Sequence, residues 1–269
     1  MRLVALPLLL ATFLPLAAPA VATAQEAIRM PAATQPGRDR VVVRERVFWH
    51  SLDDGIDLLH SDTEVAYGLT RDFAVNLSIP VVFEFDEHGD NDQGIGDLHI
   101  MGKYRFYLAN PGPVDTFRAS ALFGVDIPSW DPDMSSRSFN PMVGAVVTRI
   151  TGRHGINAAA RYKVKFDGVP EPLLAGEGEA DTLWADASYL YRLSPDQYSA
   201  ETTSSAYAVV ETGLIYETNG DAQWVISPGF LYEAQTWALG VNVTLPAWQQ
   251  LDHRPDLDLG LAIDLRFLF

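Results

Sequence analysis

The strongest constraint on this chain is a row of apolar residues that repeats at every second position up to the last residue. Seven residues of the final stretch share this parity: Leu257, Leu259, Leu261, Ile263, Leu265, Phe267 and Phe269. The positions between them include Asp258, Asp264 and Arg266. A helix repeats every 3.6 residues and cannot hold such a row on one face, whereas a strand places alternate side chains on opposite faces. The stretch is therefore predicted to be a strand with one apolar and one polar face.

The same alternation recurs from about residue 40 onward and predicts twelve strands. They are expected near residues 40–49, 61–70, 73–82, 96–107, 117–127, 141–149, 156–166, 181–191, 205–216, 223–232, 236–246 and 255–269. About ten residues is the length that a tilted strand needs to cross a bilayer. Long and tight connections alternate, except at 192–204, as in outer-membrane barrels with long external loops and short periplasmic turns. The predicted fold class is all-β, a closed antiparallel transmembrane β-barrel of about twelve strands over residues 40–269.

A soluble β-sandwich or a lipocalin-like binder would show the same alternation, with the apolar face turned into a core. Two features favour the membrane barrel. Aromatic residues gather at strand ends, where rings suit the membrane interface: Tyr104, Phe106, Phe117, Phe166, Tyr191, Tyr207, Tyr216, Trp224, Trp237 and Phe267. Phe269 resembles the signal by which the barrel-assembly machinery of Gram-negative bacteria recognises its clients. We therefore expect apolar side chains to face lipid and polar ones to face the lumen.

The beginning of the chain predicts export. Arg2 precedes an apolar stretch over 3–22 that ends in Ala22-Thr23-Ala24, a small-x-small cleavage pattern. Residues 1–24 are predicted to be a cleavable signal peptide, and an uncleaved N-terminal anchor is the alternative, although three prolines would interrupt a spanning helix. Residues 25–39 are expected to form a short N-terminal periplasmic segment, too short for a plug domain but long enough for a strand-like obstruction. The expected location is the cell outer membrane.

Acidic residues dominate the predicted outer loops. The chain has 35 Asp and Glu against 19 Lys and Arg, a formal charge of -16, which argues against nucleic acid as a partner because phosphates would be repelled. Nineteen of the acids fall in the outer loops, beside only Arg137 and Arg254. Either these loops keep the surface soluble and bind divalent cations shared with lipopolysaccharide, or they concentrate cations while interior bases hold a substrate. The expected partners are outer-membrane lipid, lipopolysaccharide and a small-molecule solute.

Polar side chains on the inward parity are the candidates for lining a transport path. They are Asp97, His99, Lys103, Arg105, Arg118, Asp126, Arg161, Lys163 and Lys165. Lumen charges are expected to pair across the barrel, with Asp97, Asp126, Asp258 and Asp264 as the acids that neutralise the bases. Twelve strands spaced 4.8 Å apart and tilted by about 40° give a circumference of about 75 Å, and side chains would leave a lumen of roughly 10 Å. Such a lumen would admit a small solute.

A more specific pattern covers residues 65–107. Tyr-Gly-Leu-Thr at 67–70 leads through a two-residue turn into Phe73-x-Val75-x-Leu77-x-Ile79-Pro80; Gly94-Ile95-Gly96-Asp97-Leu98 and Gly102-Lys103-Tyr104-Arg105 follow after an acidic loop. This order resembles the outer-membrane family described as transporters of the meta pathway of phenol degradation. The resemblance implies a Gram-negative outer-membrane β-barrel that passes small compounds such as aromatics.

Residues that could carry chemistry do not assemble into a recognisable site. The alternating acids from Asp86 to Asp92 lack the terminal Glu of a twelve-residue calcium loop. Four histidines are expected in outer loops, where two that met could bind zinc or copper: His50, His60, His88 and His253. We assign no catalytic residue, no metal and no cofactor.

The predicted function is a passive, porin-like channel for small molecules rather than an enzyme. Two alternatives stay open. One is a structural barrel without transport. The other is an outer-membrane hydrolase that uses a dyad drawn from His60, Asp62, His88 and Asp90.

Overall fold

The computed structural model describes residues 26–87, 90–112, 114–131, 134–166, 174, 176, 178–199 and 201–269, without the side chains of 84–92. The predicted signal peptide, residues 1–24, lies outside the described residues. The strands are β1 (Val41–Leu52), β2 (Ile56–Gly68), β3 (Phe73–Glu87), β4 (Asp90–Ile95), β5 (Leu98–Ala109), β6 (Thr116–Ile127), β7 (Asn140–Thr151), β8 (His154–Lys163), β9 (Thr182–Ser194), β10 (Ser204–Glu217), β11 (Ala222–Ala234), β12 (Trp237–Gln250) and β13 (Leu257–Leu268). A 3-10 turn, η1 (Asp53–Gly55), joins β1 to β2. In the described part of the chain, no helix is long and apolar enough to cross a membrane.

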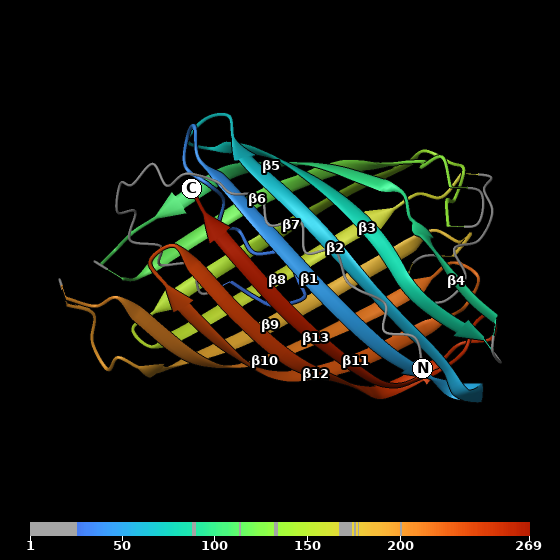
Figure 1. Cartoon of the computed structure of the whole chain (residues 1–269). Coiled ribbons are helices and arrows are strands. Elements are labelled where there is room, and N and C mark those ends of the chain that lie inside the picture. The colour runs from blue at the N-terminus through green and yellow to red at the C-terminus, as the bar shows by residue number, and fades with distance from the viewer. Residues whose placement is uncertain are drawn as a thin grey trace.

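The strands form one antiparallel sheet that closes into a barrel (Figure 1). The first strand pairs with the last, and at this seam the Phe269 amide donates to the Val41 carbonyl at 2.9 Å. Strands β4 and β5 both pair with β3, one along each half, and Gly96 and Asp97 separate them. They therefore occupy one position in the wall. The prediction of a closed twelve-strand antiparallel barrel is confirmed.

The connections distinguish the two ends of the barrel. The two longest, over 128–139 and 164–181, join strands at one end, together with the shorter connections over 53–55, 218–221 and 251–256, and we call it the outer end. The other end carries the connections over 69–72, 110–115, 152–153, 195–203 and 235–236, and we call it the periplasmic end. This assignment follows the loop lengths of outer-membrane barrels.

Apolar side chains face outward and polar ones face the lumen. In the middle of β13, Ile263 is 48% exposed whereas its neighbour Asp264 is 0% exposed. A soluble sandwich would reverse this arrangement, so that alternative is excluded. The alternation breaks at the start of β13, where a register shift against β1 turns Leu257 inward and leaves Asp258 exposed, so the prediction of Asp258 as a lumen acid is wrong. Such a bulge inserts one extra residue and redirects the side chains beside it.

Exposed aromatic rings occupy both ends of the wall, as the interface argument predicts. They include Tyr104, Phe106, Phe117 and Trp237 toward the periplasmic end and Phe166, Tyr216 and Trp224 toward the outer end. For Tyr207 the prediction is wrong, because its side chain is fully buried and its hydroxyl lies 2.6 Å from that of Tyr198. Tyr207 lies on the inward parity of β10, so the lumen receives this ring.

Candidate transport pathway

A stretch of chain that precedes β1 runs through the interior of the barrel (Figure 1). We call residues 26–34 the lumen segment. Ala27 and Ala33 are completely buried, and Ile28 packs so close to the wall that a Cβ at Gly240 would lie 2.8 Å from its Cγ1. The prediction of a periplasmic segment over 25–39 is therefore wrong for these residues. Their apolar side chains and backbone polar groups find partners inside the barrel, as a strand-like obstruction would.

Charged side chains on one side of the wall hold the first part of the lumen segment. The Glu211 carboxylate on β10 accepts hydrogen bonds from the amides of Ile28, at 2.8 Å, and Arg29, at 3.0 Å. Arg44 on β1 and Arg266 on β13 donate to the Ala27 carbonyl at 3.0 and 2.8 Å. A segment without strand pairing needs such partners, because buried backbone groups are costly when left unsatisfied.

The other side of the wall holds the rest of the lumen segment. Lys103 on β5 donates to the carbonyls of Ala32 and Thr34, both at 2.9 Å. The Thr148 hydroxyl on β7 accepts from the Ala33 amide at 2.9 Å. The segment is thus fastened to opposite parts of the wall and crosses the lumen between them.

Five of the nine predicted pathway residues line the lumen: His99, Lys103, Asp126, Arg161 and Lys163. Besides Lys103, they form acid–base pairs, but with nearby strands rather than across the barrel as predicted. Asp126 lies 2.5 Å from His99 Nδ1 and 2.8 Å from Lys163 Nζ. Arg161 donates to Asp186 on β9 at 2.9 Å. The pairs His99–Asp126 and Arg161–Asp186 join neighbouring strands, whereas Asp126–Lys163 reaches past β7 from β6 to β8. They stiffen the wall.

Two predicted residues belong to the outer end rather than to the pathway. Asp97 is buried and accepts hydrogen bonds from Ser129 and Ser135, so it anchors the loop over 128–139. Lys165 lies beyond β8, which ends at Lys163 instead of near residue 166. Its amide donates to an Asp181 carboxylate oxygen at 2.8 Å.

Two more lie at the periplasmic rim. Arg105 forms a salt bridge with Asp72 in the turn between β2 and β3, with Nη2 and Oδ1 2.7 Å apart. Arg118 donates to the Thr116 hydroxyl at 3.3 Å, close to the start of β6. Both face the interior but act where the wall ends.

Of the main charged cluster of the lumen, sequence reasoning identified only Asp264, as an acid that neutralises lumen bases. Asp264 lies between Arg44 and Arg266, with shortest N to O distances of 2.6 Å to each. Arg44 is paired in register with Arg266 across the seam. Alternation on β13 places Asp264 and Arg266 on the inward parity, so that signal was present in the sequence. The irregular pattern of β1, where Glu45 shares the parity of its valines, concealed Arg44.

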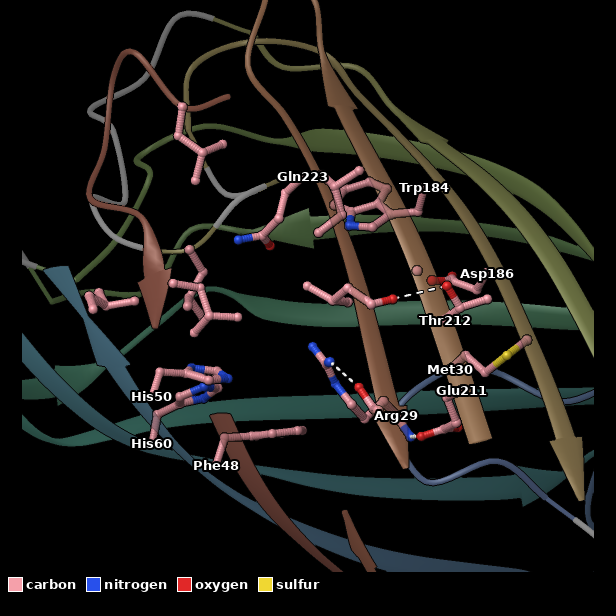
Figure 2. A pocket seen from close by; sticks show the side chains of 18 of the residues that line it. Arg29, Met30, Phe48, His50, His60, Trp184, Asp186, Glu211, Thr212 and Gln223 are labelled. Carbon is pink, nitrogen blue, oxygen red and sulfur yellow. Dashed lines mark hydrogen bonds between the residues drawn. The ribbon is translucent and has the colours of Figure 1, made fainter. Parts of the chain in front are cut away.

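A cavity of about 200 Å³ lies above the lumen segment toward the outer end. Arg29 and Met30 of the segment contribute to its lining (Figure 2). The lining also includes aromatic and imidazole rings, apolar side chains and loop residues: Phe48, His50, His60, Trp184, Leu52, Val225, Leu257, Leu174, Leu251 and Pro255. Polar and charged side chains share this lining: Arg161, Asp186, Glu211, Thr212, Gln223 and Ser227. Polar groups that converge beside apolar and aromatic side chains fix the orientation of small organic ligands.

An ion-pair network ties the loops above this cavity together. Arg254, which is nearly fully buried, lies 2.6 Å from Glu217 Oε2 and 3.5 Å from Asp221 Oδ2. The exposed ring of His253 lies 2.9 Å from Asp221 Oδ1, and this hydrogen bond, with the charge of Asp221, raises the pKa of His253. Burial works to raise the pKa of Asp221, but its hydrogen bonds with His253 and the Asp252 amide lower it.

The histidine expectation is met in part. His50 and His60 lie in β1 and β2 rather than in loops, and their ring centroids are 5.4 Å apart. Among the residues that the structure describes, no three His, Asp or Glu side chains are placed to hold a metal ion. The side chains from Asp86 to Asp92 lie outside that description.

Comparison with known proteins agrees with this architecture. A solved outer membrane channel from Pseudomonas putida F1 matches 86% of this chain and 96% of its own, with 11% identity and a TM-score of 0.61. The NanC porin matches 84% of this chain and 98% of its own, with 11% identity and a TM-score of 0.50. No curated protein matches the chain. At these identities the likeness concerns the fold alone.

The barrel is closed, its apolar side chains face outward and its polar side chains line the interior. These features define a porin-like outer-membrane β-barrel. A family model described as "Putative MetA-pathway of phenol degradation" matches residues 51–252, well over half of the chain. This protein belongs to that family, as the pattern over residues 65–107 suggested.

Proposed function

We propose that this protein is a passive outer-membrane channel for small molecules, and that the lumen segment must shift for a solute to pass. The observation that supports this most is how the lumen is filled. Among the described residues, the lumen segment occupies it, and side chains such as Glu211 and Lys103 hold this segment rather than strand pairing. Without that run, polar side chains would surround a passage of roughly 10 Å, as worked out from the strand number.

Aromatic compounds are the proposed solutes. The cavity presents the rings of Phe48, Trp184 and two histidines beside apolar residues, and aromatic rings pack favourably against one another. Membership of the phenol-degradation family points the same way. Passage would be by diffusion.

The occluded lumen also favours the rival function, a structural barrel without transport. In that case the lumen segment would be a permanent part of the interior. The hydrolase alternative has less support, because Asp62 of the suggested dyad is engaged by Arg46. His88 and the side chain of Asp90 lie outside the described residues.

The proposal includes a location and partners. The chain would be exported with a cleavable signal peptide, recognised through Phe269 by the assembly machinery and inserted into the outer membrane. Its acidic outer loops would meet lipopolysaccharide through divalent cations. Heat-modifiable gel mobility of membrane fractions, and N-terminal sequencing of the mature protein, would test insertion and cleavage at Ala24.

Liposome swelling separates a channel from a structural barrel. Purified protein and a variant that lacks residues 26–34 are reconstituted, and the influx of small neutral and charged solutes is compared with that into empty liposomes. We expect influx through the wild-type protein and faster influx through the variant. No influx through either folded protein would refute transport and favour the structural barrel. Equal influx through both would refute occlusion by the lumen segment.

A further inference from the structure

We propose that the cavity above the lumen segment binds a small organic anion with a single apolar ring, and that Arg29 binds its anionic group. This inference rests on the proposed function, because it names the substrate class of the same pathway. It assigns a ligand-binding role to a residue of the segment that fills the pore.

Arg29 has hydrogen-bonding capacity to spare. Among the described residues, its guanidinium is engaged through Nη1, which donates to the hydroxyls of Ser227 at 3.0 Å and Thr244 at 2.8 Å. Within the described part of the chain, its guanidinium forms no salt bridge, and Nε and Nη2 have no hydrogen-bond acceptor. These two nitrogens form the edge through which arginine binds a carboxylate with two parallel hydrogen bonds.

The nearby charges leave Arg29 as the group available to an anion. Arg161 and Asp186 are paired with each other at 2.9 Å. Both oxygens of Glu211 accept backbone amides of the lumen segment, and one also accepts the Asn242 side chain at 3.0 Å. A ligand carboxylate would therefore meet an arginine whose counter-charge is turned toward the backbone.

His50 provides a second polar group at the same cavity. It is only 5% exposed, and its Nδ1 has no hydrogen-bond partner in the described structure. Buried polar atoms are nearly always hydrogen-bonded, so this unsatisfied atom, in a residue that lines the cavity, points to a polar partner that the described structure does not hold. Figure 2 shows His50 and His60 on one side of the cavity and Trp184 across it, with Arg29 projecting between them.

The size of the cavity limits the ligand. A cavity of about 150 Å³ engineered in another protein binds benzene. The present one, at about 200 Å³, would hold one substituted ring but no oligosaccharide. A flat ring between Phe48 and Trp184 would place a carboxylate toward Arg29 at the floor.

Calorimetric titration of the full chain in detergent micelles, with benzoate as the probe and phenol as the neutral ring, tests this site near pH 7. We expect Arg29→Gln to weaken benzoate binding about tenfold or more, through lost charge-assisted hydrogen bonds. Arg29→Lys keeps the positive charge but cannot form two parallel hydrogen bonds with a carboxylate, so it should give an intermediate loss of benzoate affinity. Arg38→Gln is the matched control, since Arg38 lies just beyond the segment and its side chain is 74% exposed. Phenol should bind the wild-type protein more weakly than benzoate does, and Arg29→Gln should leave the affinity for phenol unchanged.

Heat-modifiable mobility of each variant confirms a folded barrel before titration. Absence of benzoate binding to the wild-type protein would overturn the site, and so would equal affinity in the folded Arg29→Gln variant. If benzoate binds as predicted but liposomes show no influx, transport fails while the binding site stands. If solutes enter but benzoate does not bind, only the site fails.

Discussion

The hydrogen bonds between Glu211 and the lumen segment offer the sharpest test of how the pore is closed. Its carboxylate accepts the amides of Ile28 and Arg29, and hydrogen bonds to a charged group contribute about 1.5 to 3 kcal/mol each. Replacement of Glu211 by Ala removes both acceptors, so the segment should be released more easily by about 3 to 6 kcal/mol. At about 1.4 kcal/mol for each factor of ten, the detached population would rise roughly 10² to 10⁴-fold.

Glu211→Gln should have a smaller effect. The amide oxygen can still accept both backbone groups, and the Asn242 side chain, whose Oδ1 has no partner in the described structure, can turn to meet the new NH2 group. Neutral hydrogen bonds are about half as strong as charge-assisted ones, which puts the loss near 2 kcal/mol, or about thirtyfold. The two variants therefore predict an ordered series.

Hydrogen exchange of the Ile28 and Arg29 amides, measured by NMR in micelles, follows local opening directly. Exchange should accelerate from wild type to Glu211→Gln to Glu211→Ala, and the fraction of time open in a planar bilayer should follow the same order. Asp126→Asn is the matched control, because Asp126 is another lumen acid but pairs with wall residues. Identical exchange in all four proteins would refute the reasoning.

Three further predictions concern the outer loops and the lipid face. Arg254→Ala leaves the Glu217 carboxylate buried without its counter-charge, a loss of about 3 to 5 kcal/mol, so limited proteolysis should cut the outer loops faster. The pair of His253 with Asp221 should stabilise the loops while the imidazole is protonated, below its ordinary pKa of 6.5, and this is lost as pH rises through the raised pKa. NMR titration should show the pKa of His253 falling in Asp221→Asn; an unchanged value would contradict the pairing. Ile263→Arg places a charge on the lipid face near mid-strand and should lower the free energy of unfolding from liposomes by about 2 to 4 kcal/mol in urea titrations.

Most of the fold prediction came from side-chain alternation, because neighbouring residues alone show which face of a strand is apolar and which is polar. On β13, Ile263 and Asp264 occupy the faces that their parity indicates. The predictions were wrong where the local sequence pattern differs from the way the strands pair in the barrel. Tyr207 looked like an interfacial ring but turns into the lumen, and β8 ends before Lys165, so that this residue belongs to a loop.

The candidate site was predictable only in part, for a similar reason. Inward parity identified Lys103 and Arg161 as lumen residues, but parity says nothing about what each side chain binds. Lys103 meets backbone carbonyls of a segment about 70 residues earlier, and Arg161 meets an acid on the next strand. Such partners depend on which strands become neighbours.

By itself, the sequence determined the strand number, the closed barrel and which face meets lipid, because a period of two and a bilayer-length repeat are properties of neighbouring residues. The tertiary structure alone decided that residues 26–34 enter the lumen and that Arg29 lines a cavity beside His50. The sequence of a short segment without periodicity does not indicate where the segment lies in the fold. Its place is set by distant donors and acceptors, Glu211, Arg44 and Lys103, which come within reach only when the barrel has closed.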